Sequence, residues 1–262
     1  MPGGDVLGLL TRIAETSSID AAWGLATGHL SGLGFRRINY GFTRFRHQRT
    51  IGDPDDALFL TTCDADYAQR YFRGGFYCRT PAFRWAERNT GICTWSWVRE
   101  AYEAGRLSEA EAEAVRQNVA IGVKAGITVS FPEASARAKG AMGMIADPGL
   151  DHAAVDAILA ARRDEILAVA HMMHLKIIQS PHLARARALS PRQREALEWV
   201  ADGKTTQDVA LLMGVSPAMV EKHLRLAREA LAVETTAQAV AKGALLNMIF
   251  QRPPEPQAQA AH

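Results

Sequence analysis

The chain has 262 residues, of which 48% are hydrophobic and 22% charged, and its formal net charge is +2. This composition is ordinary for a globular protein, and the length is sufficient for two domains. No run of about eighteen apolar residues occurs, which excludes a membrane-spanning helix. The first residues lack a basic segment ahead of an apolar core, so no secretory signal is expected.

The first two thirds of the chain alternate between helical and strand patterns. In chain order, these patterns predict helices at residues 5–15 and 19–31, strands at 35–45 and 58–62, helices at 64–72 and 81–87, a strand at 92–97, a helix at 108–121, strands at 126–131 and 140–146, and a long helix at 151–179. Because the strands are mostly hairpin-like neighbours, we expect an α+β fold: an α/β/α sandwich around an antiparallel sheet.

The pattern divides the chain into two domains. The first domain is predicted at residues 1–179 and is neutral, so the positive excess lies after it. Residues 180–188 lack a period and form the predicted linker, and residues 189–250 form a second, all-α domain. The polar, proline-rich residues 251–262 are expected to be disordered.

The second domain contains three short helical patterns separated by tight stops. Ser190, Thr205 and Ser216 are each placed to cap one of these helices. Gly203 ends the first helix and Gly214 makes the turn between the second and third. A fourth helix is predicted at residues 236–250. The spacing of the second and third helices is typical of a helix-turn-helix, although a three-helix bundle of any function could share it.

The third helix has one apolar and one polar face. Val220, Leu224, Ala227 and Leu231 recur on the buried face. The opposite face suits the major groove, where the first turn reaches base edges and cations hold phosphates. The predicted DNA contacts are Lys204, Thr205, Thr206, Ser216, Ala218, Met219, Lys222, Arg225 and Arg228.

This stretch resembles the DNA-binding module of LuxR-type transcription factors. The resemblance rests on Leu189-Ser190-Pro191-Arg192, Glu195, Leu197, Gly203-Lys204-Thr205, Val209-Ala210, Val215-Ser216, Val220 and Lys222-x-Leu224. The chain departs from the family at Gln193, where Glu is usual, and at Thr235, where many members have Arg. Both replacements are compatible with the fold.

The first domain distinguishes between two families that share this module. A response regulator needs a phosphorylatable aspartate on a parallel β/α sheet, and no such pattern is found. The domain instead resembles the autoinducer-binding domain of quorum-sensing LuxR-type regulators. The matching motifs are Tyr67-x-x-x-Tyr71, Thr80-Pro81, Thr94-Trp95-Ser96 and Gly122-x-x-x-Gly126-Ile127-Thr128.

The resemblance implies a buried pocket for an N-acyl homoserine lactone or a related small apolar ligand. Its predicted contacts are Cys63, Tyr67, Tyr71, Thr80, Phe83, Trp95 and Val115. Three of these differ from the family, which has Trp at the position of Tyr67, Asp at that of Thr80 and often Tyr at that of Cys63. Losing the charge-assisted bond of the aspartate costs about 1.5–3 kcal/mol. A different ligand, a protein partner or a ligand-independent regulator therefore stay open as alternatives.

No cofactor, catalytic residue or metal site is expected. The three cysteines are an odd number without a C-x-x-C pair, typical of free thiols in a reducing cytoplasm. His171 and His174 are one helical turn apart, but without a third ligand nearby a packed pair is favoured. Taken together, the sequence predicts a cytoplasmic homodimeric regulator that binds double-stranded DNA at a two-fold operator and contacts no membrane.

Overall fold

The computed structural model describes residues 6–47, 51–180 and 188–250. The chain divides into two compact units, Met1–Ile178 and Gln179–His262. Most of the predicted linker, residues 181–187, and the predicted disordered tail, residues 251–262, lie outside the described residues.

A five-stranded sheet lies at the centre of the first unit, and every neighbouring pair of strands is antiparallel. The strands are β1 (Arg37–Thr43), β2 (Leu58–Thr61), β3 (Gly91–Thr94), β4 (Gly126–Ser130) and β5 (Lys139–Ile145). Their order across the sheet is β2-β1-β5-β4-β3. Five strands were expected and the antiparallel sandwich is confirmed.

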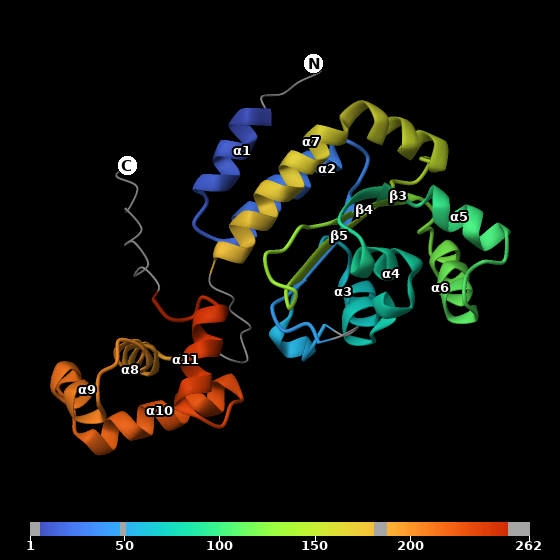
Figure 1. Cartoon of the computed structure of the whole chain (residues 1–262). Coiled ribbons are helices and arrows are strands. Elements are labelled where there is room, and N and C mark those ends of the chain that lie inside the picture. The colour runs from blue at the N-terminus through green and yellow to red at the C-terminus, as the bar shows by residue number, and fades with distance from the viewer. Residues whose placement is uncertain (1–5, 48–50, 181–187, 251–262) are drawn as a thin grey trace. The chain divides into compact units, whose positions relative to one another are not determined.

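Helices cover both faces of the sheet, with α1, α2 and α7 on one side and α3 and α4 on the other (Figure 1). Their bounds are α1 Val6–Glu15, α2 Ile19–Ser31, α3 Ala65–Ala68, α4 Pro81–Arg88, α5 Ser96–Glu103, α6 Glu109–Ala120 and α7 His152–Gln179. A π turn, Gln69–Arg73, and a 3-10 turn, Phe76–Arg79, connect α3 to α4.

The two faces of the sheet pack against different layers of helices, because successive side chains of a strand point in opposite directions. On β1, Ile38 and Tyr40 are fully buried in the core beneath α1, α2 and α7, as are Met142 and Met144 of β5. The alternate positions face the other layer of helices. There β1, β4 and β5 carry mostly small or polar residues, and this leaves room for the cavities described below.

The long helix α7 is bent, whereas the sequence predicted a continuous helix. Arg162 has φ −130° and ψ 19°, which interrupts the helical backbone. Almost all buried residues of α7 follow the break, and only Val155 precedes it. Beside the break, the Glu165 carboxylate binds Arg162 and accepts a 2.7 Å hydrogen bond from Nε2 of His29 on α2. The second half of α7 therefore packs into the core, whereas the first half buries only Val155.

The predicted strand at residues 92–97 is wrong in its second half. Strand β3 ends at Thr94 and helix α5 begins at Ser96. The aromatic and β-branched residues favoured a strand, but the backbone of Trp95 leaves the extended conformation, with φ −87° and ψ 12°, and begins α5. The sequence does contain the signal of the missed helix: Arg99 and Glu103 are four residues apart and form an ion pair, and Gly105 has φ 64° after the last turn.

Within residues 188–250, the second unit contains four helices: α8 (Pro191–Ala201), α9 (Thr206–Met213), α10 (Pro217–Leu231) and α11 (Thr236–Leu245). The side chains of Ser190, Thr205 and Ser216 each accept a hydrogen bond from a first-turn N–H, as predicted. Gly214 has φ 65° at the turn between α9 and α10, which a glycine adopts without strain. Helix α11 ends five residues earlier than predicted, and Asn247, with φ 52°, follows its last turn.

Candidate functional site

Two adjoining cavities lie between the sheet and the helices on its second face. The smaller has a volume of about 110 Å³ and the larger about 720 Å³. Asn39, Tyr71, Ala82, Trp95 and Gly143 line both cavities. These residues come from β1, the π turn, α4, the N-terminus of α5 and β5, so the site is assembled from segments far apart in the chain.

The structure brings together six of the seven predicted ligand contacts. Tyr67, Thr80 and Val115 line the larger cavity, Phe83 lines the smaller, and Tyr71 and Trp95 line both. The seventh, Cys63, lines neither cavity. Its backbone N–H donates to Oγ1 of Thr61 at 3.0 Å, and burial raises the pKa of its thiol.

Tyr67 and Tyr71 form a stacked pair on the wall of the larger cavity. Their ring centroids are 5.3 Å apart and their planes differ by 14°. Asp64 caps α3 by accepting a hydrogen bond from the backbone N–H of Tyr67, and the π turn begins within the same stretch. Burial raises the pKa of Tyr67 to about 12 and that of Tyr71 further, so both phenols stay protonated at neutral pH.

Trp95 closes the site from the β3 edge of the sheet. Its indole Nε1 donates a 2.8 Å hydrogen bond to Oγ1 of Thr128 on β4. Gly126, two residues earlier on β4, has to be glycine: a Cβ there would lie 2.8 Å from the Trp95 ring and 2.3 Å from the Met144 carbonyl oxygen. Sequence reasoning did not assign Thr128 a role, although it stands in one of the motifs that carried the resemblance.

Asn39 is a second site residue that the sequence analysis missed. Its Nδ2 donates to the Tyr67 hydroxyl at 3.0 Å, and its Oδ1 accepts from Oγ1 of Thr61 at 2.7 Å. In the strand pattern around residues 35–45, it is a polar residue between Ile38 and Tyr40, which face the core. That alternation was the available signal that Asn39 faces a different environment.

The wall of the smaller cavity is aromatic. Phe59 lies 4.6 Å from Phe72 and 5.8 Å from Tyr77, measured between ring centroids, and Tyr77 meets Phe83 edge-on at 5.1 Å. Aromatic and aliphatic walls suit an apolar ligand chain, with a few polar groups fixing its orientation. Polar side chains line both cavities: Thr128, Arg46, Glu87 and Lys139 the smaller, Tyr67 and Thr80 the larger, and Asn39 both.

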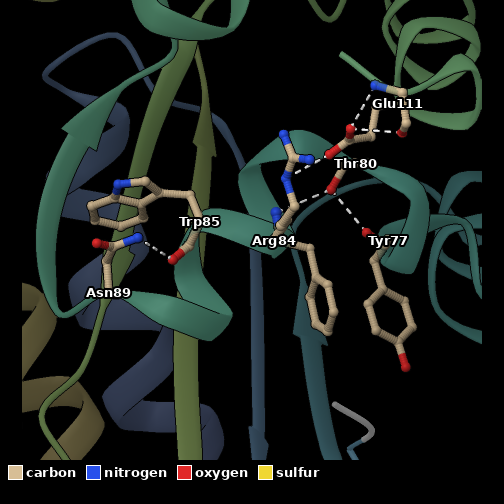
Figure 2. A network of polar contacts seen from close by, with 8 residues as sticks. Tyr77, Thr80, Arg84, Trp85, Asn89 and Glu111 are labelled. Atoms are coloured by element: carbon tan, nitrogen blue, oxygen red, sulfur yellow. Dashed lines mark hydrogen bonds and ion pairs between the residues drawn. The ribbon is translucent and has the colours of Figure 1, made fainter. Parts of the chain in front are cut away.

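Thr80 is buried, and its hydroxyl forms hydrogen bonds to neighbouring backbone groups (Figure 2). Its Oγ1 donates to the carbonyl oxygen of Tyr77 at 2.8 Å and accepts from the backbone N–H of Phe83 at 3.2 Å. Thr80 is thus the N-cap of α4, with Pro81 in the first turn as predicted. At the other end of α4, Nδ2 of Asn89 donates to the Trp85 carbonyl oxygen at 2.9 Å.

Glu111 connects α4 to α6 beside the cavity (Figure 2). Its side chain is 8% exposed and lies 2.7 Å from Nε of Arg84. Its second oxygen accepts hydrogen bonds from the backbone N–H and the hydroxyl of Ser108, which form a capping box at the start of α6. The carboxylate therefore connects two of the helices that line the larger cavity.

We expect Glu111→Ala to lower the free energy of unfolding by about 2–4 kcal/mol, because it removes a helix cap and leaves Arg84 without its carboxylate. Urea denaturation of the full chain measures this change. Glu109→Ala is the matched control: Glu109 pairs with Arg116 at 2.8 Å, but its side chain is 87% exposed. That change should cost less than about 1 kcal/mol. Equal losses for the two variants would contradict the role assigned to Glu111.

Helix α10 of the second unit has the two faces expected of a recognition helix. Val220, Leu224, Ala227 and Leu231 are buried against the other helices, as predicted. On α9, Met213 is buried whereas Leu212 is half exposed. The predicted contacts Lys204, Thr205, Ser216, Ala218, Met219, Lys222 and Arg225 are all exposed.

The cations of α10 differ in how they are held. Arg225 forms an ion pair with Glu229 and its side chain remains 53% exposed. Arg228 donates to Oγ1 of Thr236 at 2.9 Å and so connects α10 to α11. Thr206 donates to Glu221 at 2.9 Å across the turn between α9 and α10. Lys222 and Arg225 are therefore better placed than Arg228 to reach a phosphate.

A sensor-type cavity and a helix-turn-helix unit together define a class: ligand-responsive DNA-binding regulators. The family profile described as "Autoinducer binding domain" matches residues 18–177, and that described as "Sigma-70, region 4" matches residues 183–231. The chain belongs to the autoinducer-binding-domain family and is a LuxR-type transcriptional regulator, not an enzyme.

Named relatives agree with this assignment. The transcriptional activator protein SolR of Ralstonia nicotianae is 27% identical, covering 83% of this chain and 87% of its own. The transcriptional activator protein TraR of Agrobacterium vitis is 26% identical, covering 79% of this chain and 83% of its own.

Solved structures share the fold. Escherichia coli SdiA superposes with a TM-score of 0.53 at 15% identity, covering 94% of this chain and 98% of its own. CepR2 of Burkholderia cenocepacia, a LuxR family factor dependent on N-acylhomoserine lactone, superposes with a TM-score of 0.50 at 16% identity, covering 66% of this chain and 96% of its own. Within the described ranges, the helices are too short or too polar to cross a membrane.

Proposed function

We propose that the first unit binds a small amphiphile, of the N-acyl homoserine lactone type, and that this ligand controls DNA binding by the second unit. The observation that carries the proposal is the pair of adjoining cavities, which combine an aromatic wall with polar side chains such as Asn39, Tyr67 and Thr128. An acyl chain suits the aromatic wall, and a compact lactone or similar head suits the polar side chains. An open cavity also favours a sensor over a ligand-independent regulator, whose pocket would be filled by side chains.

We also propose that the second unit binds the major groove of DNA and that the protein acts as a homodimer. Helix α10 would enter the major groove, with Ala218 and Met219 near base edges and Lys222 and Arg225 at phosphates. A two-fold operator requires a homodimer. Exposed apolar side chains on two helices support it: Leu175 is 48% exposed on α7, and Leu245 is 46% exposed at the end of α11. Phe250 follows at 60%.

Native mass spectrometry tests the ligand directly. The full chain is incubated with a mixture of N-acyl homoserine lactones of different chain lengths, and the masses of protein and bound species are recorded. The proposal expects one retained ligand per chain and a dimeric assembly. A protein that retains no lactone would exclude this ligand type and favour a different ligand or a protein partner.

A further inference from the structure

Asn118, near the end of α6, brings to the larger cavity a polar atom that lacks a protein partner. Asn118 is one of the residues that line this cavity. Its side-chain carbonyl oxygen, Oδ1, is buried, and among the residues that the structure describes no donor bonds to it. A buried carbonyl oxygen without a hydrogen bond is costly, and native proteins rarely leave one unpaired. The partner of this oxygen therefore has to come from the cavity, as a ligand or as water.

The position of Asn118 on α6 turns it toward α4 and the cavity. Glu111, Ala114 and Asn118 follow one another at intervals of three and four residues and therefore share one face of the helix. On this face Ala114 is buried, and Glu111 lies 2.7 Å from Nε of Arg84 on α4 (Figure 2). The backbone carbonyl of Asn118 accepts from the N–H of Val123 at 2.8 Å and so closes the end of α6. The side chain takes no part in that closure.

Other side-chain oxygens near the cavities have partners within the protein. The Thr80 oxygen belongs to the cap of α4, and Oδ1 of Asn39 accepts from a threonine of β2. Asp151 is exposed and accepts from a backbone N–H in the first turn of α7. In the smaller cavity, Oε1 of Glu87 also lacks a hydrogen bond, but its charge partner Arg46 lies 3.7 Å away. In the larger cavity, the available neutral acceptor is thus Oδ1 of Asn118.

We infer that the ligand of this protein carries an N–H donor beside its polar head, as an N-acylated lactone does, and that Oδ1 of Asn118 accepts it. The donor supplies the hydrogen bond that the chain itself does not provide, and a ligand without it leaves the oxygen unpaired. The head would lie beside Gly143, which pairs in register with Asn39 and Thr128 and leaves a gap between their side chains. This inference rests on the proposed ligand-binding function and narrows its chemical class.

A matched pair of ligands tests the inference. N-decanoyl homoserine lactone has an amide N–H, and the decanoyl ester of α-hydroxy-γ-butyrolactone has an oxygen in its place and is otherwise the same. Isothermal titration calorimetry on the full chain should give an affinity at least about fivefold higher for the amide. The reason is that the ester leaves Oδ1 of Asn118 unpaired and places a second oxygen against it.

Two substitutions assign this preference to Asn118. Asn118→Leu is similar in size but has no acceptor, so it should lose the preference for the amide. Asn118→Asp keeps oxygen acceptors at the same place and should keep the preference. Gln117→Leu is the matched control on the same helix, because Gln117 lines neither cavity and its side chain donates to Glu113 at 2.8 Å. This control should behave as the wild type, and thermal melts check that each variant is folded.

The outcomes separate the inference from the proposed function. Equal affinities of the wild type for the two compounds, or a preference for the ester, would overturn the inference and leave the proposed function standing. Water would then be the partner of Oδ1 of Asn118. A preference for the amide that persists in Asn118→Leu would also overturn it, because another group would accept the N–H. If neither compound binds the wild type, the proposed lactone-type ligand and the inference both fall.

Discussion

Replacing Gly143 with leucine should abolish ligand binding while the protein remains folded. Gly143 lines both cavities. A Cβ placed on it would lie 3.9 Å from its nearest neighbour, the Trp95 ring. The isobutyl group would occupy the gap between Asn39 and Thr128 where the ligand head is expected. Filling this space without displacing protein atoms costs little stability, but the leucine side chain takes the volume that the ligand head would occupy. We expect affinity to fall by about a hundredfold or more, equivalent to about 2.7 kcal/mol.

Calorimetric titration with a ligand that binds the wild type measures this loss, and circular dichroism melts report on the fold. Gly24→Leu on α2 is the control, since a Cβ at Gly24 meets nothing within 4 Å and the residue lies outside both cavities. It should leave affinity unchanged. Wild-type affinity in Gly143→Leu would place the ligand elsewhere.

The second large effect is expected on α10. Removing Lys222 and Arg225 together should lower affinity for every DNA sequence and reduce the slope of log affinity against log salt by about 1.8, because each phosphate contact contributes about 0.9. The single variant Arg225→Ala should give about half of that change in slope. Fluorescence anisotropy of a labelled duplex over a salt series measures both quantities.

Arg192 of α8 provides a matched control for Arg225. Both arginines form an ion pair with a glutamate on their own helix, and their side chains are 56% and 53% exposed, respectively. Only Arg225 belongs to the proposed recognition helix. Arg192→Ala should therefore leave the salt slope unchanged. If the two alanine variants behave alike, the effect reflects net charge and α10 loses its assigned role.

The sequence predicted the helices and strands of this protein better than the points at which one passes into the next. Caps, glycines and apolar spacing located all three helices of the helix-turn-helix, because these signals are local and each has one structural meaning. The same is true of Thr80 and Pro81 at the start of α4. Trp95 shows where local signals fail: its neighbours favour a strand, but its indole bonds to Thr128 across the sheet, and that contact is not visible in a short window of sequence.

The cavity could be predicted only in part, for a related reason. Six residues came from motifs of the family, and the structure places them around one space. Asn39, Thr128 and Gly143 were missed because their importance comes from register between strands distant in the chain. The bend at Arg162 was likewise unforeseen, since nothing in the apolar stripe of α7 indicates it. The occupation of the Thr80 hydroxyl by Tyr77 and Phe83 emerged only with the folded chain.

We propose that the cavity of the first unit controls DNA binding by the second. The most direct measurement selects a duplex from a random library with the full chain, then determines its affinity by anisotropy with and without saturating ligand. We expect the ligand to change the affinity of the wild type at least about fivefold, the lower end of ordinary allosteric coupling. Gly143→Leu should show no change. Equal wild-type affinities with and without a ligand that is shown to bind would contradict the account.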